Sequence, residues 1–259
     1  MKELKKPLVS VITPAYNAEA FIAETIESVM NQTYANWEMI IVDDRSSDKT
    51  MDIIHEYAAQ DDRIKVHQLV ENSGSAVARN TAMDLAQGKF FAFLDSDDQW
   101  LPEKLAIQVA FMQENGVAFS FTKYVRMTED GKLTKAVSKA PKKVGYTQLM
   151  KHCVIGCLTV MVDREKIGEE RMVNIRTRQD YVFWLTLTKK GFDAYGLPEV
   201  LAKYRLVENS ISSNKFKAAK QNWYVYYHIE KQGLIKSLWY FTNYAFISVK
   251  NVLKYKLLK

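Results

Sequence analysis

The 259-residue chain has few of the residues that mark zinc-binding or secreted proteins. It holds two cysteines, Cys153 and Cys157, and four histidines, and neither set has the spacing of a zinc site. We therefore interpret the cysteines as reduced thiols, as expected in a reducing compartment. The first residues, Met1 to Pro7, carry no charged-then-apolar leader and run directly into a strand-like segment, which predicts a cytoplasmic location.

The chain also lacks an uncharged run long enough to cross a membrane. Its candidate, Ser237 to Val249, has 13 residues between Lys236 and Lys250, whereas a spanning helix needs about 20. Residues 215–259 nevertheless hold nine lysines and one acid, Glu230, so the basic excess of the chain lies in this tail. Aromatic stretches flanked by lysines are typical of helices in the headgroup layer of an anionic membrane. The tail is therefore predicted to attach peripherally to the inner face of the membrane, or alternatively to pack on the domain or on a partner chain.

Two other functional classes are disfavoured by what is missing. The first strand-like segment is followed by Pro14 to Asn17 rather than by a Gly-rich basic loop, which argues against a nucleotidyltransferase. The basic tail is the one feature suited to nucleic acid, and no recognition module accompanies it, so we expect no nucleic-acid partner.

The order of apolar segments predicts the fold class. Strand-like segments at residues 8–13, 39–43, 64–69 and 90–94 alternate with helix-like segments, which predicts an α/β fold with a Rossmann-like, mostly parallel sheet. A hairpin over residues 117–137 predicts a mixed sheet in the second half, followed by a helix at 179–190 and a short strand near 202–206. The predicted organisation is an α/β domain over residues 1–214 and a helical tail over residues 215–259.

Two of these strands end in clustered aspartates. Residues 95–98, Asp-Ser-Asp-Asp, follow one strand, and Asp43 and Asp44 end another. The carboxyl ends of parallel strands meet at one edge of a sheet, where open α/β folds bind ligands, so both clusters are expected to face one crevice. Carboxylates suit Mg²⁺ or Mn²⁺, whose remaining positions are filled by water and substrate phosphates. The alternative is that Asp43 and Asp44 are solvated loop acids.

Four motifs, in order, resemble the inverting family-two glycosyltransferases with the GT-A fold. They are Val9 to Asn17, Ile41 to Asp48, Asn72 to Asn80 and Phe93 to Asp98. Residues 155–160, 174–180 and 204–214 further resemble transferases that build teichuronic acid and related surface polysaccharides in Gram-positive bacteria. The resemblance implies an enzyme that moves a sugar from a UDP-sugar donor to a lipid-linked saccharide acceptor, with inversion at the anomeric carbon.

The resemblance also implies where the nucleotide binds. Pro14, Ala15 and Tyr16 would hold the uracil and ribose, and Asp44 would accept the uracil N3–H through its carboxylate. Arg79, one turn into the following helix, would reach the base or the diphosphate. The alternatives are a packed turn aromatic at Tyr16 and an exposed helix arginine at Arg79.

The resemblance makes Asp97 the direct ligand of Mn²⁺ or Mg²⁺. Asp95 would face the ribose or a metal-bound water, and Ser96 is counted with the nucleotide-binding residues. The metal would offset the charge that builds on the diphosphate as the sugar–phosphate bond breaks. Val207 and Glu208 stand where several relatives carry an additional histidine ligand, which argues against a third protein ligand there.

Asp180, at the start of a predicted helix, matches the family's catalytic base, which takes the proton of the acceptor hydroxyl. The alternative is that Asp180 caps this helix. Trp184 and Arg205 are expected to contact donor or acceptor, Arg205 through bidentate hydrogen bonds to a phosphate, and residues 210–214 are a candidate lid. A catalytically inactive sugar-nucleotide-binding or scaffold protein of the same fold is the alternative function, and the retained acidic residues argue against it.

Overall fold

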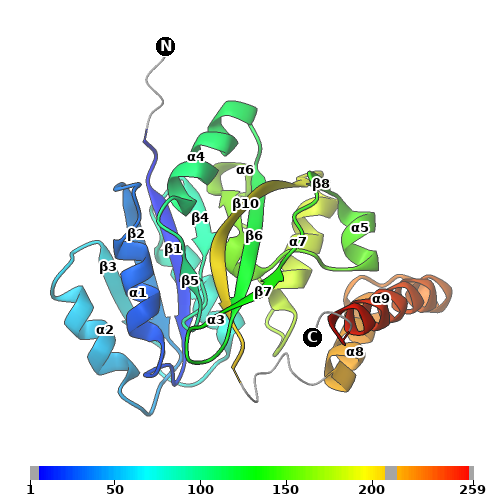
Figure 1. The fold of residues 1–259 in the computed structure, drawn as a ribbon, viewed down its shortest axis with the longest axis horizontal. Helices are drawn as coiled ribbons and strands as arrows, with labels where there is room; N and C mark the ends of the chain where they lie inside the picture. The colour runs from blue at the N-terminus through cyan, green and yellow to red at the C-terminus, as the bar shows by residue number, and fades with distance from the viewer. Residues whose placement is uncertain (1–5, 208–214, 257–259) are drawn as a thin grey trace.

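A computed structural model describes residues 6–207 and 215–256, in which helices cover both faces of a ten-stranded sheet (Figure 1). Its first half consists of β1 (Val9–Ala15), α1 (Ile22–Met30), β2 (Trp37–Asp43), α2 (Thr50–Ala58), β3 (Ile64–Gln68), α3 (Ser75–Leu85) and β4 (Phe90–Phe93). The strands pair in parallel in the order β3-β2-β1-β4. The predicted parallel half of the sheet is therefore confirmed.

The second half of the sheet is mixed, as predicted. Its elements are β5 (Gln99–Trp100), α4 (Lys104–Asn115), β6 (Phe119–Met127), β7 (Leu133–Val137), β8 (Lys143–Val144), α5 (Tyr146–Lys151), β9 (Met161–Asp163), α6 (Arg164–Ile167), α7 (Gln179–Lys189) and β10 (Ala194–Arg205). β9 lies antiparallel between β4 and β6, and β7 forms a hairpin with β6. The strand expected near residues 202–206 is the end of β10, which pairs in parallel with β6.

The central strand β1 is buried on both faces, as expected for a strand covered by helices on each side. Ile12 belongs to one apolar cluster, which α3, α5 and α7 complete. Val9 and Val11 belong to a second cluster, on the opposite face, with residues of α1, α2 and α4. In α1 the buried Ile22, Ile26 and Val29 recur at helical spacing and form the stripe that faces the sheet. This packing leaves the carboxyl ends of β1, β2 and β4 uncovered by helices.

The C-terminal tail forms α8 (Lys215–Tyr224), a π-helical turn η2 (Val225–Ile229) and α9 (Gly233–Lys256), and it packs beside α5 and α7 (Figure 1). Val225 and Tyr226 are fully buried in the cluster that contains α7. One face of the tail thus packs on the α/β domain, which was the alternative to membrane attachment. The domain boundary at residue 214 stays a prediction, since residues 208–214, including the candidate lid, lie outside the described residues.

Glu230 fixes the tail to the domain through polar contacts. Its Oε2 accepts hydrogen bonds from Tyr146 Oη at 2.6 Å and from Lys189 Nζ at 3.1 Å, and its side chain is buried. We expect Glu230→Ala to lower the free energy of unfolding by about 1–3 kcal/mol, because it removes the acceptor of the Tyr146 hydroxyl proton. Urea unfolding measures this loss, with Glu114→Ala on the exposed face of α4 as the control. An unchanged midpoint for Glu230→Ala would show that this contact does not hold the tail.

Candidate active site

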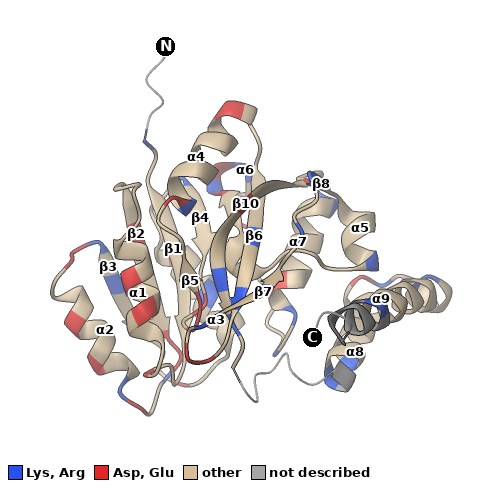
Figure 2. Cartoon of the chain, viewed as in Figure 1, with Lys and Arg blue, Asp and Glu red and all other residues tan. Residues whose placement is uncertain are grey.

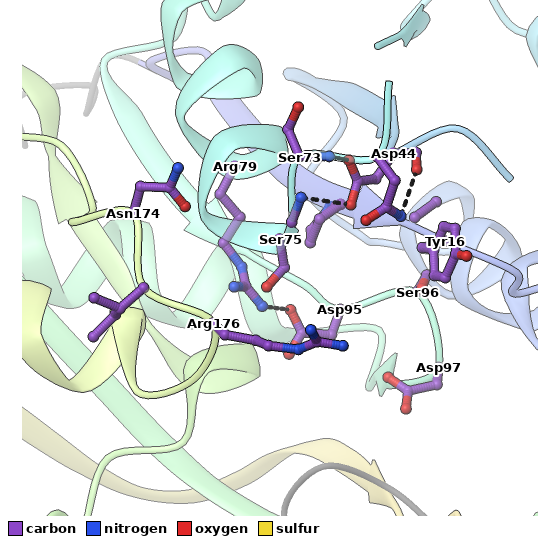
Figure 3. Close-up of a pocket in the computed structure, with 15 residues that line it drawn as sticks. Tyr16, Asp44, Ser73, Ser75, Arg79, Asp95, Ser96, Asp97, Asn174 and Arg176 are labelled. Carbon is purple, nitrogen blue, oxygen red and sulfur yellow. Dashed lines mark hydrogen bonds and ion pairs between the residues drawn. The ribbon is translucent and has the colours of Figure 1, made fainter. Parts of the chain in front are cut away.

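A cavity of about 610 Å³ opens at the carboxyl ends of β1, β2 and β4 (Figure 3). It is lined by residues from four loops of the parallel half and from the segment that precedes α7: Pro14, Ala15, Tyr16, Asp44, Asn72, Ser73, Gly74, Ser75, Arg79, Asp95, Ser96, Asp97, Asn174, Ile175 and Arg176. All the residues predicted to bind nucleotide or metal are among them. Asp180, Trp184 and Arg205, predicted for catalysis or for donor and acceptor contacts, are not.

Asp44 organises the part of the cavity nearest β2. Its carboxylate accepts hydrogen bonds from the backbone N–H groups of Ser73, at 2.6 Å, and Gly74, at 2.8 Å (Figure 3). Gly74 has φ +93°, a left-handed conformation that glycine adopts without strain and that aims both N–H groups at Asp44. Asp43, by contrast, accepts hydrogen bonds from Ser46 N in its own turn and from Gln68 Nε2 at the end of β3, each at 2.9 Å. Both aspartates are buried, so the interpretation as solvated loop acids was wrong.

Tyr16 lies at the mouth of the cavity with about half of its surface exposed, 51%. The alternative interpretation as a packed turn aromatic is therefore not what the structure shows. The next residue, Asn17, has φ +47°, and its side-chain oxygen accepts a hydrogen bond from Ser47 N at 2.9 Å. This contact ties the loop after β1 to the loop after β2. The loop that carries Tyr16 is thus held at the mouth of the cavity, where an exposed aromatic ring suits contact with a planar base.

Arg79 is buried, with 6% of its surface exposed, and it forms an ion pair with Asp95 (Figure 3). The alternative of an exposed helix arginine was therefore wrong. Burial is the largest single effect and acts to lower the pKa of Arg79, but the negative charge and the hydrogen bond of Asp95, with a smaller effect from Asp180, act together in the opposite direction, and the pKa is raised. Within the described residues, Nε and Nη1 of Arg79 are buried without a hydrogen-bond partner. Such donors are costly to leave unpaired, which points to a ligand or water beside them.

The loop of residues 95–98 is held from two sides. The Thr25 hydroxyl in α1 donates to the carbonyl oxygen of Asp98, at 2.8 Å, and its Oγ1 lies 3.0 Å from the carbonyl oxygen of Ser96. The buried Asp98 carboxylate accepts a hydrogen bond from Arg205 N in β10 at 2.8 Å. Burial and the negative charge of Asp97 raise the pKa of Asp98 well above its ordinary value. Asp98 therefore serves to hold the loop, while Asp95 and Asp97 face the cavity.

Asp97 has the surroundings of a cation ligand. Burial, together with the negative charge of Asp95, raises the pKa of Asp97 to about 6, and no side chain among the described residues donates a hydrogen bond to its carboxylate. Asp95 commits Oδ1 to Arg79. No group of three or more His, Cys, Asp or Glu side chains in the described residues is arranged to hold a metal. The donor set therefore fits a hard divalent cation that takes one or two carboxylates and completes its shell with phosphates and water.

The Arg205 guanidinium binds groups of the protein and does not line the cavity. Its Nε donates to the carbonyl oxygen of Asp97 at 2.9 Å, its Nη1 donates to the carbonyl oxygen of Glu129 at 2.7 Å, and its Nη2 pairs with Glu24. The side chain is almost fully buried, and it lies over the Phe21 ring. This placement does not support the predicted phosphate contact, and it makes Arg205 a positioning residue for the loop that carries Asp97.

Asp180 lies in the first turn of α7, next to the cavity rather than among its lining residues. Its neighbour Gln179 donates through Nε2 to Ser75 Oγ at 2.6 Å, and Ser75 does line the cavity. Arg178, the residue before α7 begins, has φ +70°, and no side chain caps this helix. The structure thus gives no support to the alternative that Asp180 is a helix cap. Its charge acts on Arg79, as described above, so it is close to the cavity's buried cation.

Trp184 is fully buried in the core, one turn beyond Asp180. Its ring packs against Phe93, Phe119 and Phe183, with centroid distances of 5.5, 5.2 and 5.4 Å. This placement does not support a contact with donor or acceptor. Trp184 instead fixes α7 against β4 and β6, and so helps to set the position of Asp180.

Three lining residues, Asn174, Ile175 and Arg176, received no role from the sequence. They belong to the segment of residues 174–180 that resembles surface-polysaccharide transferases, and this resemblance was the available signal. The segment is anchored to α3 by paired bonds with Asn80, whose side chain donates to Met172 O and accepts from Met172 N, each at 2.8 Å. It therefore forms a fixed wall of the cavity opposite the loop after β2.

Comparisons of the sequence give a consistent result. A family model described as glycosyl transferase family 2 matches residues 10–170. TuaG of Bacillus subtilis (strain 168), provisionally named a teichuronic acid biosynthesis glycosyltransferase, is 55% identical over 245 residues, with 95% of this chain and 97% of TuaG covered. WfgD of Escherichia coli, a UDP-Glc:α-D-GlcNAc-diphosphoundecaprenol β-1,3-glucosyltransferase, is 41% identical over 244 residues, with 94% of each chain covered.

Solved structures share the fold. Staphylococcus aureus TarS, residues 1–349 in complex with UDP, has a TM-score of 0.63 at 25% identity, and the match covers 76% of this chain and 60% of that chain. The mannosyltransferase PcManGT from Pyrobaculum calidifontis, in complex with GDP-Man and Mn²⁺, has a TM-score of 0.69 at 18% identity, with 93% of this chain and 74% of that chain covered.

Proposed function

The chain belongs to glycosyltransferase family 2, and from this premise we propose that it transfers a sugar from a UDP-sugar to a saccharide carried on a lipid. The observation that carries the proposal is the convergence of Asp44, Arg79 and Asp97 on one cavity at the strand ends. The relatives support the substrate classes, since the name of WfgD specifies UDP-Glc and a diphosphoundecaprenol-linked acceptor, and TarS was solved with UDP. The likeness to TuaG supports a place in the synthesis of a cell-surface polysaccharide of the teichuronic acid type.

In this proposal the uracil and ribose bind between the loops after β1 and β2. The Tyr16 ring would stack on the base, and Pro14 and Ala15 would contact it through backbone groups. Asp44 is already oriented by two backbone N–H donors, and its remaining lone pairs would accept the uracil N3–H. Arg79, which lines the cavity, would contact the base or the diphosphate through its guanidinium.

The diphosphate would lie beside the loop of residues 95–98. Asp97 would hold Mn²⁺ or Mg²⁺, with Asp95 toward the ribose or a metal-bound water and Ser96 beside the nucleotide. The bound cation would offset the charge that grows on the diphosphate as the sugar leaves. The Arg205 guanidinium would keep the Asp97 backbone in place for this role.

Asp180 would act as the base. The acceptor hydroxyl oxygen attacks the anomeric carbon from the face opposite UDP, its proton passes to the Asp180 carboxylate, and the bond from the anomeric carbon to the diphosphate oxygen breaks. The name of WfgD supports inversion, because a β-linkage made from UDP-Glc, in which glucose is α-linked, reverses the anomeric configuration. Fixing Asp180 to the cavity wall through Gln179 and Ser75 would orient the carboxylate for this transfer.

The proposal is tested by measuring UDP release from UDP-glucose, UDP-galactose, their N-acetyl forms and UDP-glucuronate. Each donor is offered with a lipid-diphosphate-linked saccharide, in Mn²⁺ and in chelator. We expect turnover with at least one donor in Mn²⁺ and much less in chelator. Metal-dependent UDP binding without turnover of any donor would instead support the inactive sugar-nucleotide-binding protein. If neither turnover nor UDP binding is observed, both interpretations are excluded.

We further propose that the exposed face of α9 contacts an anionic membrane. Leu234, Ile235 and Trp239 are 58%, 85% and 49% exposed, and Figure 2 shows lysines on α8 and α9. Within residues 6–207 and 215–256, no helix combines the length and the hydropathy that crossing a bilayer demands. Apolar side chains interleaved with lysines suit the headgroup layer, and this contact would bring the cavity to a lipid-carried acceptor.

Ile235→Glu is expected to weaken binding to anionic liposomes about tenfold or more, because it removes an apolar side chain that the headgroup layer would bury and adds a charge that the anionic surface repels. Co-sedimentation with phosphatidylglycerol vesicles measures the effect. The matched control is Leu133→Glu in β7, which is 60% exposed on the α/β domain and should bind as the wild type does. Equal binding by Ile235→Glu and wild type would exclude this face of α9 as the contact.

A further inference from the structure

Arg176 is a cation of the cavity that has no role in the proposed function. Its side chain is exposed and lines the cavity, and Figure 3 shows it reaching from the segment before α7 toward the aspartates that follow β4. Within the part of the chain that the structure describes, Arg176 makes no ion pair or hydrogen bond. Arg79, the other cation among the described lining residues, is already paired with Asp95. Arg176 therefore offers its full guanidinium to a ligand.

The charges of the cavity indicate which ligand group it would meet. The pair of Arg79 and Asp95 is neutral as a unit, and Asp44 faces the base-binding part of the cavity. Asp97 with a divalent cation would carry one net positive charge, whereas the diphosphate of a nucleotide sugar carries about two negative charges at neutral pH. One further cation is needed for balance, and Arg176 is the lining residue that can supply it.

We propose that Arg176 binds the donor diphosphate, an inference that rests on the proposed function and names a further residue of its site. A guanidinium presents paired N–H donors that match phosphate oxygens, so it would contact the diphosphate directly. The same contact would stabilise the charge that accumulates on UDP when the bond to the sugar breaks.

The position of Arg176 also links donor binding to catalysis. Arg176 and Asp180 belong to one segment, which is anchored to α3 before Arg176 by Met172 and after it by Gln179. A diphosphate held by Arg176 would therefore sit at a fixed place relative to the base. This arrangement makes Arg176 a ligand of the leaving group that fixes the place of the diphosphate relative to Asp180.

The test is calorimetric titration of uridine and of UDP into wild type, Arg176→Ala and Arg176→Lys, each in Mn²⁺ and in chelator. Arg176→Ala should weaken UDP binding about 10- to 100-fold in both conditions, as expected for the loss of hydrogen bonds to a charged group. Uridine binding should not change, and Arg176→Lys should recover part of the UDP affinity because it restores the charge without the paired donors. Lys135→Ala, which removes one charge from the exposed face of β7, is the control and should bind UDP as the wild type does.

Several outcomes would overturn the inference. Wild-type affinity of Arg176→Ala for UDP would do so. Equal losses for uridine and UDP would show that the substitution disturbs the whole cavity. If the wild type bound neither uridine nor UDP, the proposed function itself would be contradicted. This result is distinguishable from a failure of the inference about Arg176, in which the wild type still binds UDP.

Discussion

Asp180→Asn should lower kcat by about 10²- to 10⁴-fold, the usual contribution of a positioned general base. The amide keeps the shape of the side chain and cannot take the proton of the acceptor hydroxyl. Because Asp180 lies beside the donor cavity and outside its lining, UDP affinity should stay within about twofold of wild type. Steady-state UDP release at saturating donor and acceptor gives kcat, and calorimetric titration gives the affinity for UDP.

The matched control for this substitution is Asp52→Asn, which makes the same change at an exposed position of α2. Asp52→Asn should turn over as the wild type does. An Asp180→Asn enzyme with near-normal kcat would assign the base to another residue. A loss of UDP affinity as large as the loss of kcat would show that Asp180 supports the donor site instead of acting on the acceptor.

Asp97→Asn should lower turnover by about 10²-fold or more, since it removes the carboxylate expected to hold the cation. By offsetting the charge on the leaving group, that cation would stabilise the transition state by several kcal/mol. Its clearest signature is in binding. Wild type should bind UDP more tightly in Mn²⁺ than in chelator, whereas Asp97→Asn should bind UDP with the same weak affinity in both. Calorimetric titration under the two conditions measures the difference, and Asp62→Asn on an exposed turn is the control.

A metal-stimulated affinity that survives Asp97→Asn would contradict this assignment and would favour Asp95 as the ligand. That outcome has a structural basis, because Arg79 binds only Oδ1 of Asp95, and Oδ2 could bind the cation. A wild type that is indifferent to Mn²⁺ in both turnover and UDP binding would mean that the cavity neutralises the diphosphate with protein cations alone.

The parallel half of the fold could be read from the sequence because its signals are local. Each strand there is a short apolar run followed by a helix-like segment, and connections of this kind leave few topologies open. The position of β9 was harder to predict. Only three residues long, it lies antiparallel between β4 and β6, and both partners are remote in sequence. Pairing of that kind depends on tertiary packing that no short window of sequence contains.

The site shows the same division. Residues 14–16, Asp44 and the loop of residues 95–98 end strands that the sequence located, so their meeting at one cavity was predictable. The buried position of Trp184 was not predictable, because α7 has buried residues on nearly every side of the helix. A helix of that kind has no pattern that tells which face meets the cavity.

Arginines were the least predictable residues of the site. Arg205 has its partner Glu24 in α1, at the other end of the α/β domain's sequence, and this ion pair diverts it from the predicted phosphate contact. Arg176 lies in a segment without regular structure, where neither periodicity nor a strand end marks it. Only the folded structure shows that the Arg205 guanidinium is paired with Glu24, whereas the Arg176 guanidinium can bind a ligand in the cavity.

The central claim is that Asp44 and Asp97 serve one ligand, with the base of a nucleotide at the first and its diphosphate and cation at the second. A crystal structure of the chain with UDP and Mn²⁺, with anomalous scattering used to locate manganese, tests it most directly. We expect an anomalous peak about 2.1 Å from an oxygen of Asp97 and uracil N3 within hydrogen-bond distance of Asp44. Manganese bound elsewhere, or UDP outside this cavity, would contradict it.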